Sequence, residues 1–456
     1  METGEKKSLI RRLKDVPPVR LIVSSFFIII VIGAVLLALP ISARDRQATD
    51  LLSSFFTSTS ATCVTGLVVF DTWTHWSAFG QVVILGLIQL GGLGLVTFTS
   101  GFTLFLRRRL DLRDMQIAKE YTNGSTLDLP RLLRTIMFFT FVCEAFGSFL
   151  LMLRFVPMFG GKGIWISVFL SVSAYCNAGF DILGFLKPDA SLELFVGDPL
   201  VCLTICCLII LGGIGFIVTV DLYNWGRKRV RKEERRPHLT LHTRIVLVST
   251  ASLLVLGTVL TLGLEYDHTL KDLNASFFQS VTARTAGYAT IPQGELGDAT
   301  KLVTIILMFI GASPSSTGGG IKTTTFVVLV ATVVSISRGR DETVINKRRV
   351  DKSVVYRAMT IVAMAFLVIA ITSGVIMVTT PPEVSAIDAV YEAVSAFGTV
   401  GLTTGLTPDL SIVAKILVML TMFIGRVGPI SLVLALTMKH SGGPGKILPE
   451  GKVIVG

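Results

Sequence analysis

The sequence SAFGTVGLTTG, from Ser395 to Gly405, is a short polar stretch with three glycines that interrupts a very apolar chain. Mean hydropathy is +0.70, and charged residues make up only 16% of the sequence. Several uncharged runs have the roughly 20 residues that an α-helix needs to cross the hydrocarbon core of a bilayer. They are Leu21–Ser42, Ser77–Leu106, Pro199–Val220, Ile245–Leu264 and Ala358–Thr380. The composition predicts an all-α polytopic membrane protein.

Sequences related to GTVGL occur three more times in the chain. TCVTGL ends at Leu67, CNAGF ends at Phe180 and RTAGY ends at Tyr288. The shared glycines are Gly66, Gly179, Gly287 and Gly401, with separations of 113, 108 and 114 residues. A quarter of the 456 residues is 114, so the repeat covers nearly the whole chain. The predicted divisions are residues 1–110 with a cytosolic N-terminal tail, 111–235, 236–345 with an intramembrane gating loop, and 346–456 with the C-terminal tail.

Each repeated glycine follows an apolar stretch that is too short to span a membrane, such as Asp50–Thr62. An aromatic residue stands ten positions before each glycine: Phe56, Phe169, Phe277 and Tyr391. We expect each unit to contain a long span, a short re-entrant helix, a glycine loop and a second long span. Non-helical backbone at membrane depth is tolerated only where protein buries it or water reaches it. The sequence therefore predicts eight transmembrane spans and four loops around a pseudo-fourfold pore.

Four glycine loops that face one axis would suit the binding of a dehydrated cation. Backbone carbonyl oxygens can replace the hydration shell of such an ion, and glycine permits the positive φ that turns them toward the axis. The short helices would point their partially negative C-termini at the pore centre. The predicted potassium-binding residues are Val64, Thr65, Gly66, Asn177, Ala178, Gly179, Thr285, Ala286, Gly287, Thr399, Val400 and Gly401. The alternative is four packing turns, but sequence register is kept on both sides of every glycine.

The net charge of +11 is concentrated next to long apolar runs. The basic clusters are the N-terminal tail, Arg107–Arg113, Arg227–Arg236 and Arg338–Lys352. Loops rich in Lys and Arg remain cytoplasmic, so the pattern predicts four paired crossings with both termini in the cytosol. This placement argues against a nucleic-acid partner. It leaves anionic membrane lipid and a cytosolic protein as alternative partners of the basic loops.

The sequence shows no catalytic constellation, no disulfide framework and no metal-ligand spacing. The six cysteines lie in or beside apolar segments, and the five histidines lie at segment ends or in loops. The first apolar run is too long for a signal peptide, and no small-residue cleavage site follows it. GGLGL at Gly91 and GGIGF at Gly212 lack the strand–turn–helix context of a dinucleotide site, so close helix packing is expected there. An enzyme is therefore not expected.

TVGL in the last loop is similar to the filter signature of tetrameric potassium channels. Four unequal copies in one chain resemble the Trk/Ktr/HKT superfamily of potassium-translocating proteins. GASPSSTGGGIKTTTF, from Gly311 to Phe326, resembles the broken second helix of that family's third repeat. FIGRVGP, from Phe423 to Pro429, resembles the arginine-bearing second helix of its fourth repeat. Because the first span begins without an extra amino-terminal hairpin, the resemblance is to the bacterial KtrB type of membrane subunit.

Proline, three successive glycines and several hydroxyls should unwind the helix at Gly311–Phe326. Unwound backbone must line water or protein, and the resemblance implies a gate below the filter rather than a structural kink. The predicted gate residues are Ser315, Ser316, Thr317, Gly318, Gly319, Gly320, Lys322 and Arg426. Two other mid-span charges are given structural roles, Glu144 as a packing partner and Arg284 as a brace behind the filter. Carbonyls freed near Gly318–Gly320 are the expected acceptors for Arg426.

The resemblance implies potassium uptake across the bacterial cell membrane. It also implies a homodimer and a separate cytosolic ring of nucleotide-binding (KtrA-like) regulatory subunits, because the cytosolic loops are too short to hold such a domain. No cofactor is expected in this chain; potassium is the substrate, sodium is a candidate activator, and nucleotide belongs to the partner. A secondary sodium or potassium symporter with alternating access is the alternative. Against it, the charge pattern gives every repeat the same orientation.

Overall fold

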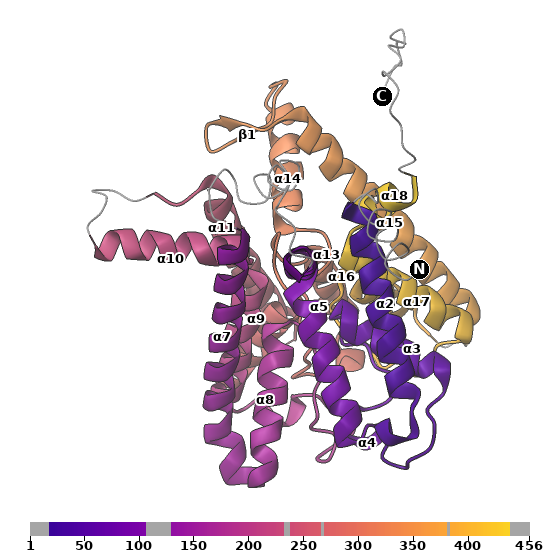
Figure 1. Cartoon of the computed structure of the whole chain (residues 1–456). Helices are drawn as coiled ribbons and strands as arrows, with labels where there is room; N and C mark the ends of the chain where they lie inside the picture. The colour runs from indigo at the N-terminus through magenta and orange to yellow at the C-terminus, as the bar shows by residue number, and fades with distance from the viewer. Residues whose placement is uncertain (1–17, 106–128, 232–237, 266–268, 381–383, 438–456) are drawn as a thin grey trace, which may run out of the picture.

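The computed structural model describes residues 18–105, 129–231, 238–265, 269–380 and 384–437. Most of these residues are helical (Figure 1). Within the described part of the chain, the one sheet is the antiparallel pair of β1 (Val344–Ile345) and β2 (Arg348–Arg349). The predicted N-terminal tail and the basic cluster Arg107–Arg113 lie outside the described residues.

The helices follow the chain in the order expected from the sequence repeat. In the first half they are α2 Pro18–Ala38, η1 Pro40–Ser42, α3 Leu51–Cys63, α4 Thr72–His75, α5 Ala78–Phe105, α7 Leu129–Phe159, α8 Gly161–Tyr175, η2 Glu193–Phe195, α9 Pro199–Gly213 and α10 Phe216–Val230. In the second half they are α11 Leu241–Glu265, α12 Leu270–Thr282, η3 Gln293–Glu295, α13 Asp298–Phe309, α14 Thr323–Ser337, α15 Lys352–Thr379, α16 Ala386–Gly398, α17 Ile412–Val427 and α18 Pro429–Thr437.

Several helices are apolar enough to lie in a membrane. Among the described residues, three helical stretches have membrane-spanning length and hydropathy: Thr135–Phe159, Leu241–Glu265 and Lys352–Thr379. The pair α9 and α10 passes the same test as one segment, but it is bent by 97°. Shorter apolar helices occur at Val23–Ala38, Ala78–Leu93 and Thr323–Ser337. The expected helical membrane protein is therefore supported by the length and composition of the helices.

The short helices α3, α8, α12 and α16 precede the four glycine loops and are 13 to 15 residues long. Each packs against the long helix before it: α3 on α2, α8 on α7, α12 on α11 and α16 on α15. Each also contacts a helix from the quarter of the chain before its own: α8 contacts α5, α12 contacts α9 and α16 contacts α13. Because α3 contacts α17, the last quarter of the chain packs against the first.

The second apolar segment of a unit is continuous only in α5; in the other three described units it is broken. The run Pro199–Val220, which is long enough for one span, instead ends as α9 at Gly213 and restarts as α10, which points away from the bundle in Figure 1. Gly212 fits the expected close packing, because a Cβ there would collide with the Tyr175 carbonyl. Gly215 causes the break, since its φ of +92° is one that helical residues do not adopt.

Candidate functional site

The four glycine loops share an unusual backbone geometry. In each loop the residue two positions before the glycine has a positive φ, as does the glycine itself. Val64 and Thr399 end α3 and α16 in the left-handed region, with φ of 58° and 49°. The remaining pairs are Asn177 (60°) with Gly179 (70°), and Thr285 (75°) with Gly287 (85°), while Gly66 has 92° and Gly401 has 96°. Positive φ at a β-branched residue is a strained conformation that the surrounding structure must hold in place.

The loops meet one another in a closed order. A Cβ atom at Gly66 would lie 2.5 Å from the Ala178 carbonyl oxygen, and one at Gly179 would lie 2.6 Å from the Ala286 oxygen. A Cβ at Gly287 would collide with the Val400 oxygen, and one at Gly401 would collide with the Thr65 oxygen. Each glycine therefore faces the carbonyl of the residue before the next glycine. The structure brings all twelve predicted filter residues into four adjoining loops.

Hydroxyl side chains from the short helices hold the loops in this shape. The amides of Gly66 and Gly401 each donate to a serine hydroxyl six positions earlier, Ser60 and Ser395, at 3.1 Å. In the other two loops the hydroxyl donates to the carbonyl after the glycine: Ser173 to Phe180 and Thr282 to Tyr288, both at 2.7 Å. Sequence reasoning missed these hydroxyls, although their fixed distance before each glycine was a visible signal.

The segment between α13 and α14, residues 310–322, is not helical and packs directly against the glycine loops. The amide of Gly319 donates to the Thr399 hydroxyl at 3.1 Å. Thr317 donates through its hydroxyl to the Tyr175 carbonyl at 3.2 Å. Among the predicted gate residues, Lys322 donates from Nζ to the carbonyls of Gly318 (2.6 Å) and Gly319 (3.4 Å). The gate prediction thus falls on one folded loop that touches the candidate filter.

The same loop fills the break between α9 and α10. The amides of Ser313 and Thr317 donate to the carbonyls of Gly213 and Gly212, at 3.1 and 3.2 Å. In return, the Phe216 amide at the start of α10 donates to the Ser315 carbonyl at 2.8 Å. These bonds satisfy backbone groups that a broken helix leaves without partners. The intramembrane loop and the α9–α10 break therefore form one hydrogen-bonded unit.

Arg426, in α17, is hydrogen-bonded to carbonyls from two other quarters of the chain. Its guanidinium donates to Thr317 in the intramembrane loop and to Gly91 in α5, with a longer bond of 3.5 Å to Gly92. The acceptor Thr317 immediately precedes the expected acceptors Gly318–Gly320. The side chain of Arg426 is thus a fixed positive charge between the loop and the first quarter of the chain.

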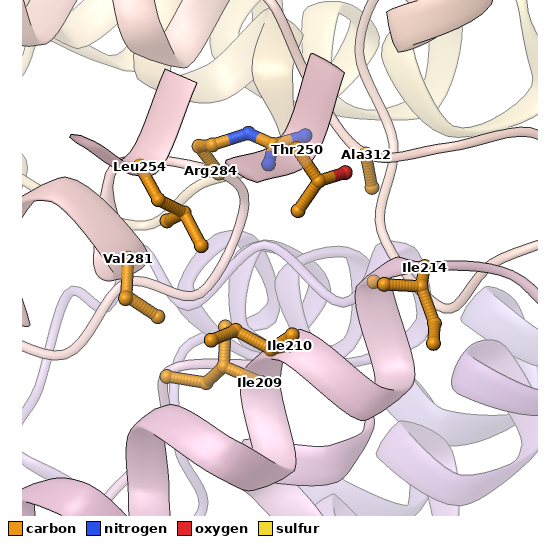
Figure 2. A pocket seen from close by; sticks show the side chains of 9 residues that line it. Ile209, Ile210, Ile214, Thr250, Leu254, Val281, Arg284 and Ala312 are labelled. Carbon is orange, nitrogen blue, oxygen red and sulfur yellow. The ribbon is translucent and has the colours of Figure 1, made fainter. Parts of the chain in front are cut away.

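Arg284 occupies a different place, beside the third glycine loop. Its guanidinium donates to the Gly311 carbonyl at 3.4 Å, and its Nε has no partner. Figure 2 shows it beside Thr250 at the edge of a pocket whose other side holds Ile209 and Ile210. The pocket volume is about 20 Å³, enough for one water molecule. The predicted role as a brace is consistent with the bond to Gly311, at the start of the intramembrane loop.

Two buried carboxylates lie behind the loops. Glu144, on α7, accepts a bond from Gln89 at 3.4 Å and contacts the thiol of Cys176 at 3.9 Å. Glu392, on α16, is fully buried; Thr407 donates to its Oε1, and its Oε2 has no partner. Sequence reasoning missed Glu392, because its short helix also carries Asp388 and Glu383 nearby and nothing local distinguishes it.

Comparison with known proteins agrees with this arrangement. The sequence profile of TrkH, a cation transport protein, matches residues 20–443. The chain belongs to the TrkH family. It is 37% identical over its whole length to the Ktr system potassium uptake protein B of Bacillus subtilis, all of which is covered. It is also 37% identical to the potassium/sodium uptake protein NtpJ of Enterococcus hirae, with 99% of each chain covered.

The fold has a solved counterpart. The crystal structure of the potassium transporter TrkH from Vibrio parahaemolyticus matches with a TM-score of 0.69 at 17% identity, covering 91% of this chain and 85% of the other. The expected superfamily and the expected TrkH-like helical fold are confirmed. Membership of a transporter family also confirms that the chain is not an enzyme.

Proposed function

We propose that this member of the TrkH family takes up potassium across the bacterial cell membrane through a channel-like pore. The observation that carries the proposal is the closed order of the four glycine loops, each facing the carbonyl of the next. Positive φ at alternate residues turns successive carbonyl groups toward the same side of the backbone. Such oxygens can replace the hydration shell of a potassium ion. Potassium is then the substrate, bound by the twelve filter residues named above.

The proposed topology has eight transmembrane spans in four repeats around a pseudo-fourfold axis, with both termini in the cytoplasm. The cyclic packing of the short helices on helices of the preceding quarter supports this symmetry. The positive-inside rule supports the orientation. In this topology the broken second segments count as single spans. The basic residues at the end of α10 and in the β1–β2 hairpin then face the cytosol.

The proposed gate is the intramembrane loop of residues 310–322, held in place by Arg426. A fixed positive charge under a potassium filter opposes an entering cation, and its bonds to Thr317 and Gly91 keep the loop in position. Opening would then require the loop to leave Arg426 or move together with it. The contacts of the loop with Thr399 and Tyr175 make it a direct neighbour of the filter.

We further propose that the chain forms a homodimer and is opened by a cytosolic ring of nucleotide-binding, KtrA-like subunits. The name of the Bacillus subtilis relative, a protein of the Ktr system, supports a multi-component transporter. Nucleotide would bind the ring and not this chain. Sodium is a candidate activator or co-substrate, because the Enterococcus hirae relative is named for uptake of both potassium and sodium.

Tracer flux in liposomes tests the proposal. Purified protein should pass rubidium down its electrochemical gradient without any sodium gradient, and excess potassium should compete with the tracer. A symporter with alternating access would instead require a sodium or proton gradient for net accumulation. Flux that follows such a gradient, and stops when the gradient is removed, would replace the channel-like pore with the symport mechanism.

A further inference from the structure

A groove of about 380 Å³ lies between α11 and α14, away from the glycine loops. Its walls are apolar, with Leu253 on one helix and Phe326, Val330 and Val334 on the other. A groove of this size is within the range of small-ligand sites, roughly 300–1,000 Å³. Val330 and Val334 are 45% and 40% exposed, so the described part of the chain leaves this wall uncovered.

One end of the groove is polar and basic. Ser335, Arg338 and Arg340 line that end, where α14 terminates. Gly339 has a φ of 70°, and the Arg340 amide donates back to the Ser335 carbonyl at 3.0 Å. This helix-ending turn fixes both arginines beside the same groove. The nearest acid with a printed partner, Glu342, is paired with Arg349 at 2.9 Å.

The groove therefore has the polarity of an amphiphile. Phe326, near the start of α14, lies at the membrane-embedded end, and the two arginines lie at the other end, one helix length away. Arginine binds phosphate through two parallel hydrogen bonds, and basic pockets between membrane helices on the cytoplasmic side bind anionic lipid headgroups. A soluble regulatory protein would contact the exposed hairpin, but it would not fill an apolar groove between two membrane helices.

We propose that this groove binds an anionic phospholipid, with the headgroup phosphate on Arg338 and Arg340 and an acyl chain along α14. The proposal rests on the membrane orientation given under Proposed function. Because α14 begins at Thr323, directly after the intramembrane loop, the bound lipid would contact the helix that continues from the proposed gate.

Native mass spectrometry of the full chain in detergent tests this site with phosphatidylglycerol and with phosphatidylcholine of the same acyl chains. The double variant Arg338→Gln/Arg340→Gln should lower the affinity for phosphatidylglycerol at least about tenfold and leave phosphatidylcholine unchanged. The matched control is Lys347→Gln/Arg348→Gln, which removes two exposed charges from the same hairpin but does not touch the groove. Equal losses in both variants, or no loss in either, would overturn the site.

A second variant tests the acyl groove while both arginines are retained. Ala331→Phe places a large side chain in the groove wall and should also weaken phosphatidylglycerol binding. Unchanged lipid binding with an altered monomer–dimer ratio would show that a second copy of the chain covers this groove, and the lipid site would be abandoned. Because binding is measured without transport, failure here leaves the proposed potassium pathway untouched.

Discussion

At the scale of single residues, the loop glycines are required for two separate reasons. Their φ angles, 92° at Gly66 and 96° at Gly401, cost a residue with a side chain roughly 1–2 kcal/mol. A side chain would also enter the space of a neighbouring carbonyl, Ala178 for Gly66 and Thr65 for Gly401. Any replacement must therefore move the oxygens that are proposed to select the ion.

Gly66→Ser and Gly401→Ser should each reduce the preference for potassium over sodium, by about tenfold, or about 1.4 kcal/mol of differential binding. The larger effect is expected at Gly401, where the collision with Thr65 is the closer one. Rubidium and sodium flux in liposomes measures the ratio. Gly405→Ser is the matched control, because Gly405 also has a positive φ (97°) but has no atom near its Cβ position. Equal loss of selectivity in the control would assign the effect to backbone strain alone.

Arg426→Ala should raise potassium flux roughly tenfold, because it removes both the charge and the bonds that hold Thr317. Arg426→Lys should give an intermediate flux, since it keeps the charge but loses the fork that reaches Thr317 and Gly91 together. Flux assays on protein reconstituted without its regulatory partner give the comparison. An alanine variant that inserts and assembles normally, yet conducts no faster than the parent, would leave Arg426 with a purely structural role.

At the scale of elements, the intramembrane loop and the α9–α10 break satisfy each other's backbone. The loop lies between the filter, which it contacts through Thr399, and α10, whose Phe216 amide it accepts. Since α10 leaves the bundle at a sharp bend, a force applied to α10 would act on the loop through this hydrogen bond. The loop is thus physically linked to a helix that faces away from the pore.

Gly215→Ala should loosen that link and raise basal flux. A Cβ at Gly215 would collide with the Pro314 carbonyl, and the φ of 92° would be strained, so Pro314 and Ser315 must shift. The control is Gly226→Ala on α10, which has open space around its Cβ position and a helical backbone. Flux without the regulatory partner is the measurement. If Gly215→Ala is folded and as tightly closed as the control, the break does not control the gate.

The segment around α4 should become less stable in acid. His75 accepts or donates a bond with Thr49 at 3.0 Å and stacks on Phe70 at 4.2 Å between ring centres. Burial lowers the pKa of His75 below its usual 6.5, with Asp45 opposing the shift. The unfolded segment therefore binds a proton more readily, and stability is lost as the pH falls below about 6.5.

Hydrogen exchange of residues 43–77 at pH 7.5 and pH 5.5, corrected for intrinsic rates, measures this effect. Protection should fall at the lower pH in the parent protein. His75→Gln keeps a polar partner for Thr49 but cannot titrate, so its protection should be the same at both pH values. A parent segment equally protected at both pH values would contradict the assignment.

At the scale of the whole molecule, sequence and structure differ in what they make visible. The four loops could be predicted because glycine, short apolar helices and basic clusters leave local patterns around Gly66 and its equivalents. The helix break at Gly215 could not, because GGIGF in an apolar run is equally typical of close helix packing. The cyclic neighbour order, such as α3 on α17, joins segments more than 300 residues apart and leaves no local pattern.

That cyclic order makes the protein depend on contacts across two seams. When the chain is divided after residue 231, each half keeps two glycine loops, and the halves meet where α12 packs on α9 and where α3 packs on α17. The two carbonyl contacts across these seams are Gly179 with Ala286 and Gly401 with Thr65. Neither half can close a ring by itself, because each lacks two of the four loops.

We therefore expect residues 1–231 and 232–456 to conduct rubidium when co-expressed as separate chains, and neither to conduct alone. The buried apolar seams, with Ile205 and Phe278 in one core cluster and Phe56 and Val418 in another, should bring the halves together in the membrane. Co-purification through a tag on one half, followed by flux in liposomes, gives both readouts. As a control, Gly401→Ser in the second half should lower the selectivity of the reassembled pair as it does in the intact chain. Selective flux from either half alone would mean that two loops suffice, and the four-loop ring would no longer explain conduction.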